Sequence, residues 1–433
     1  MAMINIQAAA KSLLGVLLVI ILPAAAAVAQ QKSEACVACH REITPFIIDQ
    51  WQASRHAQAK VGCYDCHRAK QGETDALEHN GYTIATIVSP KDCSRCHARE
   101  FKEQQNSRHA DAASFIGSLD NMLGEIVEGG PAAVSGCQQC HGSQVKVTKD
   151  GKLDAATWPN GGIGRINPDG SKGSCSACHY RHTFSLRVAR SPDTCGRCHM
   201  GPDHPQREIY QESKHGVNFM ANFEKMNIDQ KTWVLGKDYK LAPNCVTCHM
   251  GATPDLKNTH DVGTRLSWTL RPTISIKQPN ADKKREDMQS VCLSCHGPEW
   301  VTNFYLQFDN LVNHYNDKFA QPAKEIMDRL LKANKITKTP FDDKIEWTYY
   351  ELWHHEGRRA RMGAAMMGPD YTQWHGMYEV AKHFYTKFVP EAEELLPRVT
   401  KDIMDSDFHK WKKGLSKEEI GKQIEFYKGR YKQ

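Results

Sequence analysis

Eight copies of the pattern Cys-x-x-Cys-His constrain this chain more than any other feature. The chain has 433 residues and 16 cysteines, and every cysteine belongs to one of these copies. In such a motif the two thiols form thioether bonds with haem vinyl groups, and the adjacent histidine binds the iron. We therefore predict eight covalently bound haem c groups. The motif residues are Cys36/Cys39/His40, Cys63/Cys66/His67, Cys93/Cys96/His97, Cys137/Cys140/His141, Cys175/Cys178/His179, Cys195/Cys198/His199, Cys245/Cys248/His249 and Cys292/Cys295/His296.

Zinc sites and disulfide bonds are the competing interpretations of so many cysteines. A single Cys-x-x-Cys would leave zinc a fair alternative. Here each pair is followed at once by a histidine, and no cysteine is left without its motif. The regularity favours haem over both alternatives.

The first residues have the pattern of a secretory signal. Lys11 precedes an apolar run from Leu13 to Leu22, and small residues end in Ala27-Val28-Ala29. We expect residues 1–29 to be a cleaved signal peptide, with an uncleaved membrane anchor as the alternative. The mature protein is then exported to the periplasm or an equivalent extracytoplasmic compartment, where haem c is attached.

Composition divides the rest of the chain in two. Residues 30–300 hold all the motifs, separated by Gly-, Pro-, Asn- and Asp-rich turn signals and without a clear strand pattern. Residues 301–433 lack cysteine, and their apolar residues recur at helical spacing. We predict a mainly α fold, with an octahaem-binding domain followed by a C-terminal helical domain. Helices are expected within residues 319–332, 342–366, 371–388 and 417–427, the last with a capping signature at Ser416 to Glu419.

The formal net charge of +6 does not indicate a nucleic-acid partner. Each haem brings two propionate carboxylates, so eight haems add roughly sixteen negative charges and make the loaded protein acidic. We therefore expect no nucleic acid among its partners.

The chain has more histidines than its motifs use. Of 21 histidines, eight belong to motifs. An electron-transfer haem usually takes a second histidine, whereas a catalytic haem keeps one axial position open. The count does not choose which of the others bind iron. The remaining histidines are His56, His79, His109, His182, His204, His215, His260, His314, His354, His355, His375, His383 and His409.

A weak repeat marks three of these histidines. They stand in Ser54-Arg55-His56-Ala57, Ser107-Arg108-His109-Ala110 and Ser213-Lys214-His215-Gly216. The repeat indicates a recurring module of one haem and one ligand. Three unrelated surface histidines beside basic residues are the alternative.

The pattern resembles the hydroxylamine oxidoreductase family of octahaem cytochromes c over nearly the whole mature chain. Its most specific part is the close spacing of the fourth to sixth motifs, followed by Asp203-His204 and by the repeat at His215. The family implies a helical fold in which seven haems have two histidine ligands and the fourth, on Cys137/Cys140/His141, is open and catalytic. Asp203 and His204 match its distal pocket pair. The implied second ligands are His56, His79, His109, His182, His215, His260 and His354.

The resemblance also implies partners. Family members are typically homotrimers, in some cases with a second subunit, and they exchange electrons with a soluble cytochrome or a quinone-linked redox partner. In the hydroxylamine-oxidising branch a tyrosine of one subunit is attached covalently to the catalytic haem of its neighbour.

Two positions depart from the family pattern. A distal-pocket tyrosine of the family falls near Arg271 in this chain. The ungapped register puts Met367 at the position of the cross-linking tyrosine, and Tyr371, four residues later, takes that role only with a local shift. We therefore predict that the cross-link is absent.

These observations predict an oxidoreductase that acts on small nitrogen compounds at one open haem. Either direction of the chemistry needs a proton relay beside the iron, which Asp203 and His204 would supply, and Arg271 would favour an anion. Without the cross-link we expect reduction of nitrite or nitric oxide. The alternatives are oxidation of hydroxylamine, a non-enzymatic conduit in which His204 also binds iron, and a sulfur-oxyanion reductase.

Overall fold

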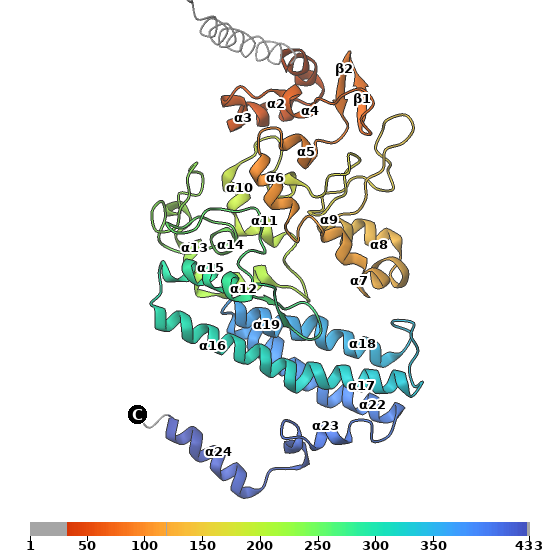
Figure 1. Ribbon diagram of the computed structural model, residues 1–433, viewed down its shortest axis with the longest axis vertical. Helices are drawn as coiled ribbons and strands as arrows, with labels where there is room; N and C mark the ends of the chain where they lie inside the picture. Colours follow the sequence, from red (N-terminus) through yellow and green to blue (C-terminus); the bar gives the residue numbers. More distant parts are fainter. Residues whose placement is uncertain (1–32, 118, 431–433) are drawn as a thin grey trace, which may run out of the picture.

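The computed structural model describes residues 33–117 and 119–430 of the chain. The predicted signal peptide, residues 1–29, lies outside the described residues. Within the described part, no helix is both long enough and apolar enough to cross a membrane. The molecule is elongated, with short helices and loops at one end and long helices at the other (Figure 1).

Short helices carry the motifs in the first part. A helical stretch at residues 33–43 holds the first motif. Helical spacing puts the first cysteine, the second cysteine and the histidine of a motif on one face, because positions i, i+3 and i+4 are neighbours there. The helices of this part are α2 (Pro45–Gln52), α3 (Arg55–Gln58), α4 (Cys63–His67), α5 (Pro90–Cys93), α6 (Ala98–Gln105), η1 (Ala112–Gly117), α7 (Leu119–Asn121), η2 (Met122–Val127), α8 (Gly130–Ser135), α9 (Cys137–His141), η3 (Cys175–Ala177), α10 (Leu186–Arg190), α11 (Pro192–Gly196), α12 (Gln206–Glu212), α13 (Lys214–Ala221), η4 (Phe223–Lys225), α14 (Cys245–His249) and α15 (Ala281–Leu293).

Two small antiparallel sheets interrupt the helices, where we expected no strand. Strands β1 (Ala76–His79) and β2 (Tyr82–Ala85) form a hairpin, and β3 (Trp268–Thr269) pairs with β4 (Ile276–Lys277). The turn of the hairpin is Asn80-Gly81, and both residues have positive φ, as a two-residue hairpin turn requires. The Asn-Gly pair was the available sequence signal. The strands beside it are too short to show a clear alternation.

Long helices with one apolar face build the C-terminal part, as predicted. On α16 (Pro298–Tyr315) the buried residues Val301, Tyr305, Phe308, Val312 and Tyr315 recur at steps of three and four. Burial of each such side chain contributes roughly 1.5–3 kcal/mol. The other helices here are η5 (Asn316–Ala320), α17 (Gln321–Lys332), α18 (Lys344–Tyr350), η6 (Glu351–Glu356), α19 (Gly357–Ala365), α20 (Pro369–Thr372), η7 (Gln373–Tyr378), α21 (Glu379–His383), η8 (Phe384–Phe388), α22 (Val389–Leu395), α23 (Lys401–Asp405), η9 (Lys410–Lys413) and α24 (Lys417–Arg430).

The predicted helices are present, but several contain a π-type turn. The expected helix at 342–366 is α18, η6 and α19 in succession, and η6 is such a turn. A π-turn inserts an extra residue into an α-helix and is frequent at functional sites. Here η6 holds His354 and His355, and α19 continues the same helix past Arg358. The predicted cap of α24 is also present, because Ser416 accepts a hydrogen bond from the Glu419 amide.

Candidate functional site

One large cavity runs through the first part of the molecule. It has a volume of about 2710 Å³ and is lined by residues of all eight motifs. Ordinary ligand pockets are smaller, about 300–1,000 Å³. All sixteen cysteines are free, so disulfide bonds do not explain them. Among the described residues, the only cluster with metal-site spacing is acidic and contains neither cysteine nor histidine, which does not fit zinc.

Cys39 is the one predicted attachment residue of the eight motifs that lies outside this cavity. The other fifteen cysteines line it, whereas Cys39 is exposed and does not. Cys36 and His40 of the same motif do line the cavity, where Cys36 contacts Cys63 and His40 faces His79. The physical reason is one-sided packing: residues 38 and 41–43 of this helical stretch are exposed as well.

The exposure of Cys39 does not test its predicted role in haem attachment. Its motif partners Cys36 and His40 do line the cavity. The thioether bond of Cys39 therefore stays a prediction.

Six motif histidines each face a second histidine across this cavity. Two imidazoles that bind one metal ion from opposite sides, each through a nitrogen about 2 Å from the ion, have ring centres roughly 6 Å apart. The observed separations of the ring centroids are 6.0 to 6.4 Å. The residues therefore fit haem with two axial histidines. The pairs are His40 with His79, His97 with His56, His67 with His182, His199 with His109, His179 with His260, and His296 with His215.

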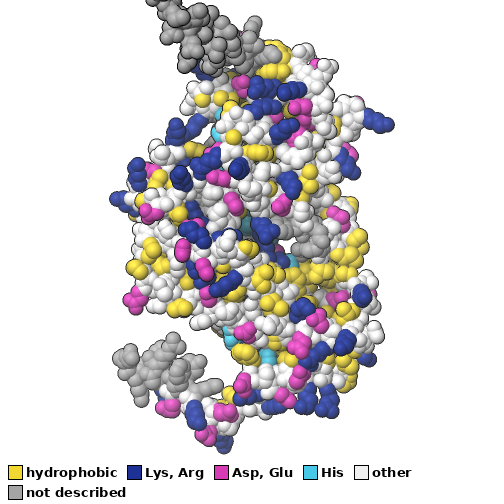
Figure 2. Space-filling model, viewed as in Figure 1, with side chains coloured by type: hydrophobic (Ala, Val, Ile, Leu, Met, Phe, Trp, Pro, Cys, Tyr) yellow, Lys and Arg dark blue, Asp and Glu magenta, His cyan; other side chains and the backbone are white. Residues whose placement is uncertain are grey.

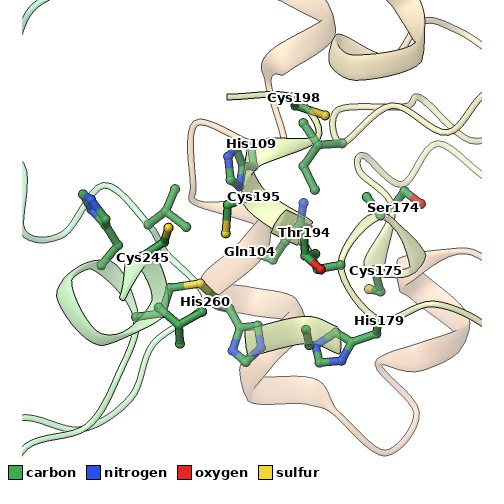
Figure 3. A pocket seen from close by; sticks show the side chains of 18 of the residues that line it. Gln104, His109, Ser174, Cys175, His179, Thr194, Cys195, Cys198, Cys245 and His260 are labelled. Atoms are coloured by element: carbon green, nitrogen blue, oxygen red, sulfur yellow. The ribbon is translucent and has the colours of Figure 1, made fainter. Parts of the chain in front are cut away.

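The second members of these pairs come from varied elements. His79 ends strand β1, and His260 lies in a loop after α14. Figure 3 shows His179 and His260 facing each other, with Cys175 nearby. Six of the seven predicted second ligands thus lie where an iron ligand is needed. The ligand roles themselves stay predictions.

The repeated Ser-x-His module has a common local structure. Ser54, Ser107 and Ser213 are all buried, with 1 to 2 % of their surface exposed. Ser54 and Ser213 cap short helices by accepting a backbone amide, and the histidine is the second residue of each helix. Ser107 donates to the carbonyl of Gln104 instead. In each copy a buried serine fixes the backbone that presents the histidine to the cavity.

His354, the seventh predicted second ligand, has other neighbours. Its ring stacks on Tyr350, with centroids 4.1 Å apart, and its Nε2 lies 2.9 Å from the Tyr350 hydroxyl oxygen. His249 is the motif histidine that remains for it once the six pairs and His141 are set aside. Its role as a ligand stays a prediction.

Contacts between cysteines order the motifs in space. Thiol hydrogen bonds join Cys36 to Cys63, Cys93 to Cys175, Cys195 to Cys245, and Cys140 to Cys198. The second and third motifs are also close, as are the fifth and sixth, and the seventh and eighth. Figure 3 shows the side chain of Cys195 between those of Cys245 and Cys198. The motifs therefore form a row in the order one, two, three, five, six, seven, eight, and the fourth joins it at the sixth.

Asp203 and His204 lie beside the fourth and sixth motifs. A carboxylate oxygen of Asp203 contacts Nδ1 of His204. The His204 ring lies 6.1 Å from that of His199, almost perpendicular to it, and the charge of His204 acts on the Cys140 thiol. His109 lies at the same distance from His199. We take His109 as the ligand because its Ser-x-His module matches those of His56 and His215, whereas His204 is held by Asp203.

Electrostatics keep Asp203 ionised. Burial by itself raises the pKa of this carboxyl, but the hydrogen bond with His204 and the charges of His354 and Arg358 together lower it to about 2. The carboxylate accepts a hydrogen bond of 3.0 Å from Nη1 of Arg358. Arg358 was not among our predicted site residues. Its helical position was visible in the sequence, but its distance from Asp203 along the chain concealed the contact.

Arg271 lines the cavity, and its charge acts on the histidine pair at the sixth motif. Burial, and after it the charge of Arg271, lowers the pKa of His109 to about 4. For His199 burial lowers the pKa most, followed by the charges of His109 and Arg271. The backbone carbonyl of Arg271 accepts a hydrogen bond from Arg358. Its predicted role toward an anion stays a prediction.

Met367 and Tyr371 occupy different environments. Met367 lines the cavity with a left-handed backbone, φ +61°, just after α19. Tyr371 is not among the residues that line the cavity, and its ring lies 5.4 Å from that of His375 near the surface. The absence of a cross-link to a neighbouring subunit stays a prediction.

The cavity, the paired histidines and the motif count are features of a multihaem cytochrome c. Residues 166–340 match the family described as seven times multi-haem cytochrome CxxCH. The chain is also similar to a probable nitrite reductase-hydroxylamine oxidoreductase fusion protein of Kuenenia stuttgartiensis, with 29% identity over 366 residues. The chain is thus similar to multihaem cytochromes c, and one of its relatives is named for nitrite reductase and hydroxylamine oxidoreductase.

Solved structures show the same fold. A protein described as a hypothetical multiheme protein has a TM-score of 0.74 at 24% identity, covering 87% of this chain and 96% of its own. The reducing HAO-like protein complex of Kuenenia stuttgartiensis has a TM-score of 0.63 at 20% identity, covering 87% and 88%. The curated fusion protein is much longer: the match covers 71% of this chain but only 39% of the relative.

Proposed function

We propose that the protein is an exported octahaem oxidoreductase that reduces nitrite or nitric oxide at a single open haem on Cys137/Cys140/His141. The observation that carries the proposal is the half-buried Asp203-His204 pair, whose imidazole lies beside His199 and acts electrostatically on Cys140. The similarity to a protein named as a nitrite reductase-hydroxylamine oxidoreductase fusion supports the same chemistry.

The reaction consumes protons as well as electrons. Conversion of nitrite to nitric oxide takes one electron and two protons and releases water. The haem, when bound, supplies the electron and the binding position for the nitrogen. In this proposal the Asp203 carboxylate accepts Nδ1–H of His204 and thereby orients the imidazole, which acts as the acid-base group beside the haem position. Similar acid-base pairs contribute about 10²–10⁴-fold to a rate.

The row of motifs supports a path for the electrons. Neighbouring motifs lie close together along the row, and the fourth is linked to the sixth by the contact between Cys140 and Cys198. In this proposal the motif histidines and the predicted second ligands would hold the seven other haems, which would only transfer electrons. A soluble cytochrome or quinone-linked partner would supply them, and the protein would act as a homotrimer, in some organisms with a second subunit.

Charges at the surface agree with a small substrate. On the face drawn in Figure 2, Lys and Arg are interspersed with Asp and Glu rather than gathered in one basic patch. Nucleic-acid binding usually needs such a patch. Small inorganic nitrogen compounds are the substrate class of this proposal.

Assays of the purified holoprotein in both directions test the proposal. With an artificial reductant we expect consumption of nitrite or nitric oxide; with an artificial acceptor we expect slower oxidation of hydroxylamine. Turnover confined to hydroxylamine would overturn the reductive direction. Oxidised protein with no high-spin signal and no spectral change on adding cyanide or nitrite would favour the non-enzymatic conduit.

A further inference from the structure

We infer that Arg358 is the positioning residue of the distal pair: it fixes the Asp203 carboxylate against His204 and ties both to the C-terminal helices. This inference rests on the proposed function, because it concerns proton delivery at the same site. Neither the family pattern nor the sequence spacing pointed to this arginine.

The segment that carries Asp203 has little structure of its own. Residues 200–205 form an irregular loop, with bends at 201–203, between the sixth motif and α12 (Gln206–Glu212). Gly201 has φ +98°, and its amide reaches only the side chain of Glu208. Because this loop has few backbone hydrogen bonds, a contact from another segment is needed to hold the carboxylate. Proton transfer tolerates only a narrow range of positions and orientations of that group.

Arg358 supplies that anchor from a rigid position. It stands on the first turn of α19 and is 8 % exposed. Its Nη1 donates to one carboxylate oxygen of Asp203 at 3.0 Å, while the other oxygen contacts His204. The two contacts together fix both the position and the rotation of the carboxylate.

The other atoms of the Arg358 side chain are fixed as well. Nε donates to the carbonyl of Arg271 at 2.8 Å, and the guanidinium carbon lies 5.2 Å from the centre of the Trp353 ring. Arg361, one turn later on α19, donates to the carbonyls of Pro272 and Gly357. Segment 271–272 is therefore held to the same helix that holds Asp203.

The charge distribution distinguishes positioning from substrate binding. The positive charge of Arg358 is already paired with Asp203, so it adds little attraction for an anion in the cavity. Its removal should therefore slow proton delivery and leave nitrite binding unchanged. A lysine at this position would keep the charge and one hydrogen bond but lose the fork that reaches both Asp203 and Arg271.

The test is a double-mutant cycle in the holoprotein. The variants are Arg358→Gln, Arg358→Lys, Asp203→Asn and the double variant of the first and third, with haem content, nitrite affinity by absorbance titration, and kcat as measurements. Arg329→Gln is the matched control, because Arg329 pairs with Asp402 in the C-terminal helices. We expect Arg358→Gln to keep its haem and its nitrite affinity and to lose about 10–100-fold in kcat, as is usual for residues that orient a reactive group.

The lysine variant and the double variant decide whether Arg358 acts by positioning Asp203. Arg358→Lys should recover part of the lost kcat, and adding Arg358→Gln to Asp203→Asn should cost nothing more, since the arginine acts through that carboxylate. An unchanged kcat in Arg358→Gln, a loss of nitrite affinity in step with kcat, or additive effects would overturn the inference. If Arg358→Gln does not incorporate haem, the comparison of Arg358→Lys with the wild type decides on the same measurements.

Failure of the proposed function gives a different result. A wild-type protein without nitrite or nitric oxide reduction would sink the proposed function alone. The same cycle would then be measured on hydroxylamine oxidation, where protons leave through the same pair.

Discussion

His109 faces His199 with their ring centroids 6.1 Å apart, although the fourth and fifth motifs separate them along the chain. His199 also has His204 as a neighbour at the same distance. The sixth motif therefore has both a predicted second ligand and the candidate catalytic pair as neighbours. In the proposed function this motif would join the electron path to the reactive site.

Replacing His109 by alanine should convert one low-spin haem to high spin. The change removes the imidazole opposite His199, and the haem of the sixth motif would become five-coordinate. Electron paramagnetic resonance of the oxidised protein would report it, together with slower reduction of the fourth haem. His314→Ala is the control, because His314 is exposed and packs near Phe408. An unchanged spectrum would remove His109 from the ligand set.

Asp203→Asn should lower turnover with nitrite by about 10²–10⁴-fold while haem content stays intact. Asparagine keeps the size of the side chain but cannot accept Nδ1–H of His204 and pair with Arg358 as a carboxylate does. Asp402→Asn removes a comparable partner of an arginine far from the cavity and serves as the control. Equal turnover in the wild type and Asp203→Asn would exclude this carboxylate from the mechanism.

Haem peptides from the purified protein should carry no covalently attached tyrosine. Met367 lines the cavity, whereas Tyr371 lies outside the lining near His375. Proteolysis followed by mass spectrometry would show the haem of Cys137/Cys140 on its own motif peptide only. A peptide that joins this haem to Tyr371 would reverse the prediction and favour hydroxylamine oxidation.

Glu356 should make the protein less stable as pH rises. Burial is the main cause that raises the pKa of this carboxyl to about 8, against about 4.3 in an unfolded chain. The folded state prefers the protonated form of Glu356. The contribution of this group to the free energy of unfolding is therefore fully present below about pH 4 and is lost as pH rises through 8. Its carboxylate also contacts His383.

Thermal unfolding of Glu356→Gln tests this dependence. Between pH 6 and pH 9 the unfolding temperature of the wild type should fall further than that of the variant. The difference corresponds to an unfolding free energy on the order of 1 kcal/mol, or about 2–4 °C. Glu351→Gln, an exposed carboxylate on the same turn, is the control. Parallel curves for the wild type and Glu356→Gln would contradict the raised pKa.

The sequence predicted the elements of the C-terminal part because their signals are local. The spacing of Val301, Tyr305 and Phe308 determines which face of α16 is buried, and Ser416 with Glu419 determines where α24 begins. The hairpin at Asn80-Gly81 escaped prediction, since its strands have only four residues each. The π-turns also escaped, because an extra residue in a turn is set by packing on neighbouring helices rather than by spacing.

The exposure of Cys39 shows the same limit within a motif. Its sequence neighbourhood is the same Cys-x-x-Cys-His pattern that places the other fifteen cysteines on the cavity. The pattern fixes the spacing of the thiols along a helix, whereas the burial of each thiol depends on which segments pack against that helix.

By itself the sequence determined the predicted cofactor, since all sixteen cysteines fall in eight haem-attachment motifs. It also indicated which histidines suit the role of second ligand, through the Ser-x-His repeat and the family resemblance. Only the tertiary structure decided which of them faces which motif, and it alone brought Arg358 to Asp203. The physical reason is the range of the interactions. Covalent attachment and helix caps join residues a few positions apart, whereas axial pairs and the anchor of the distal carboxylate join segments whose proximity depends on the packing of the whole chain.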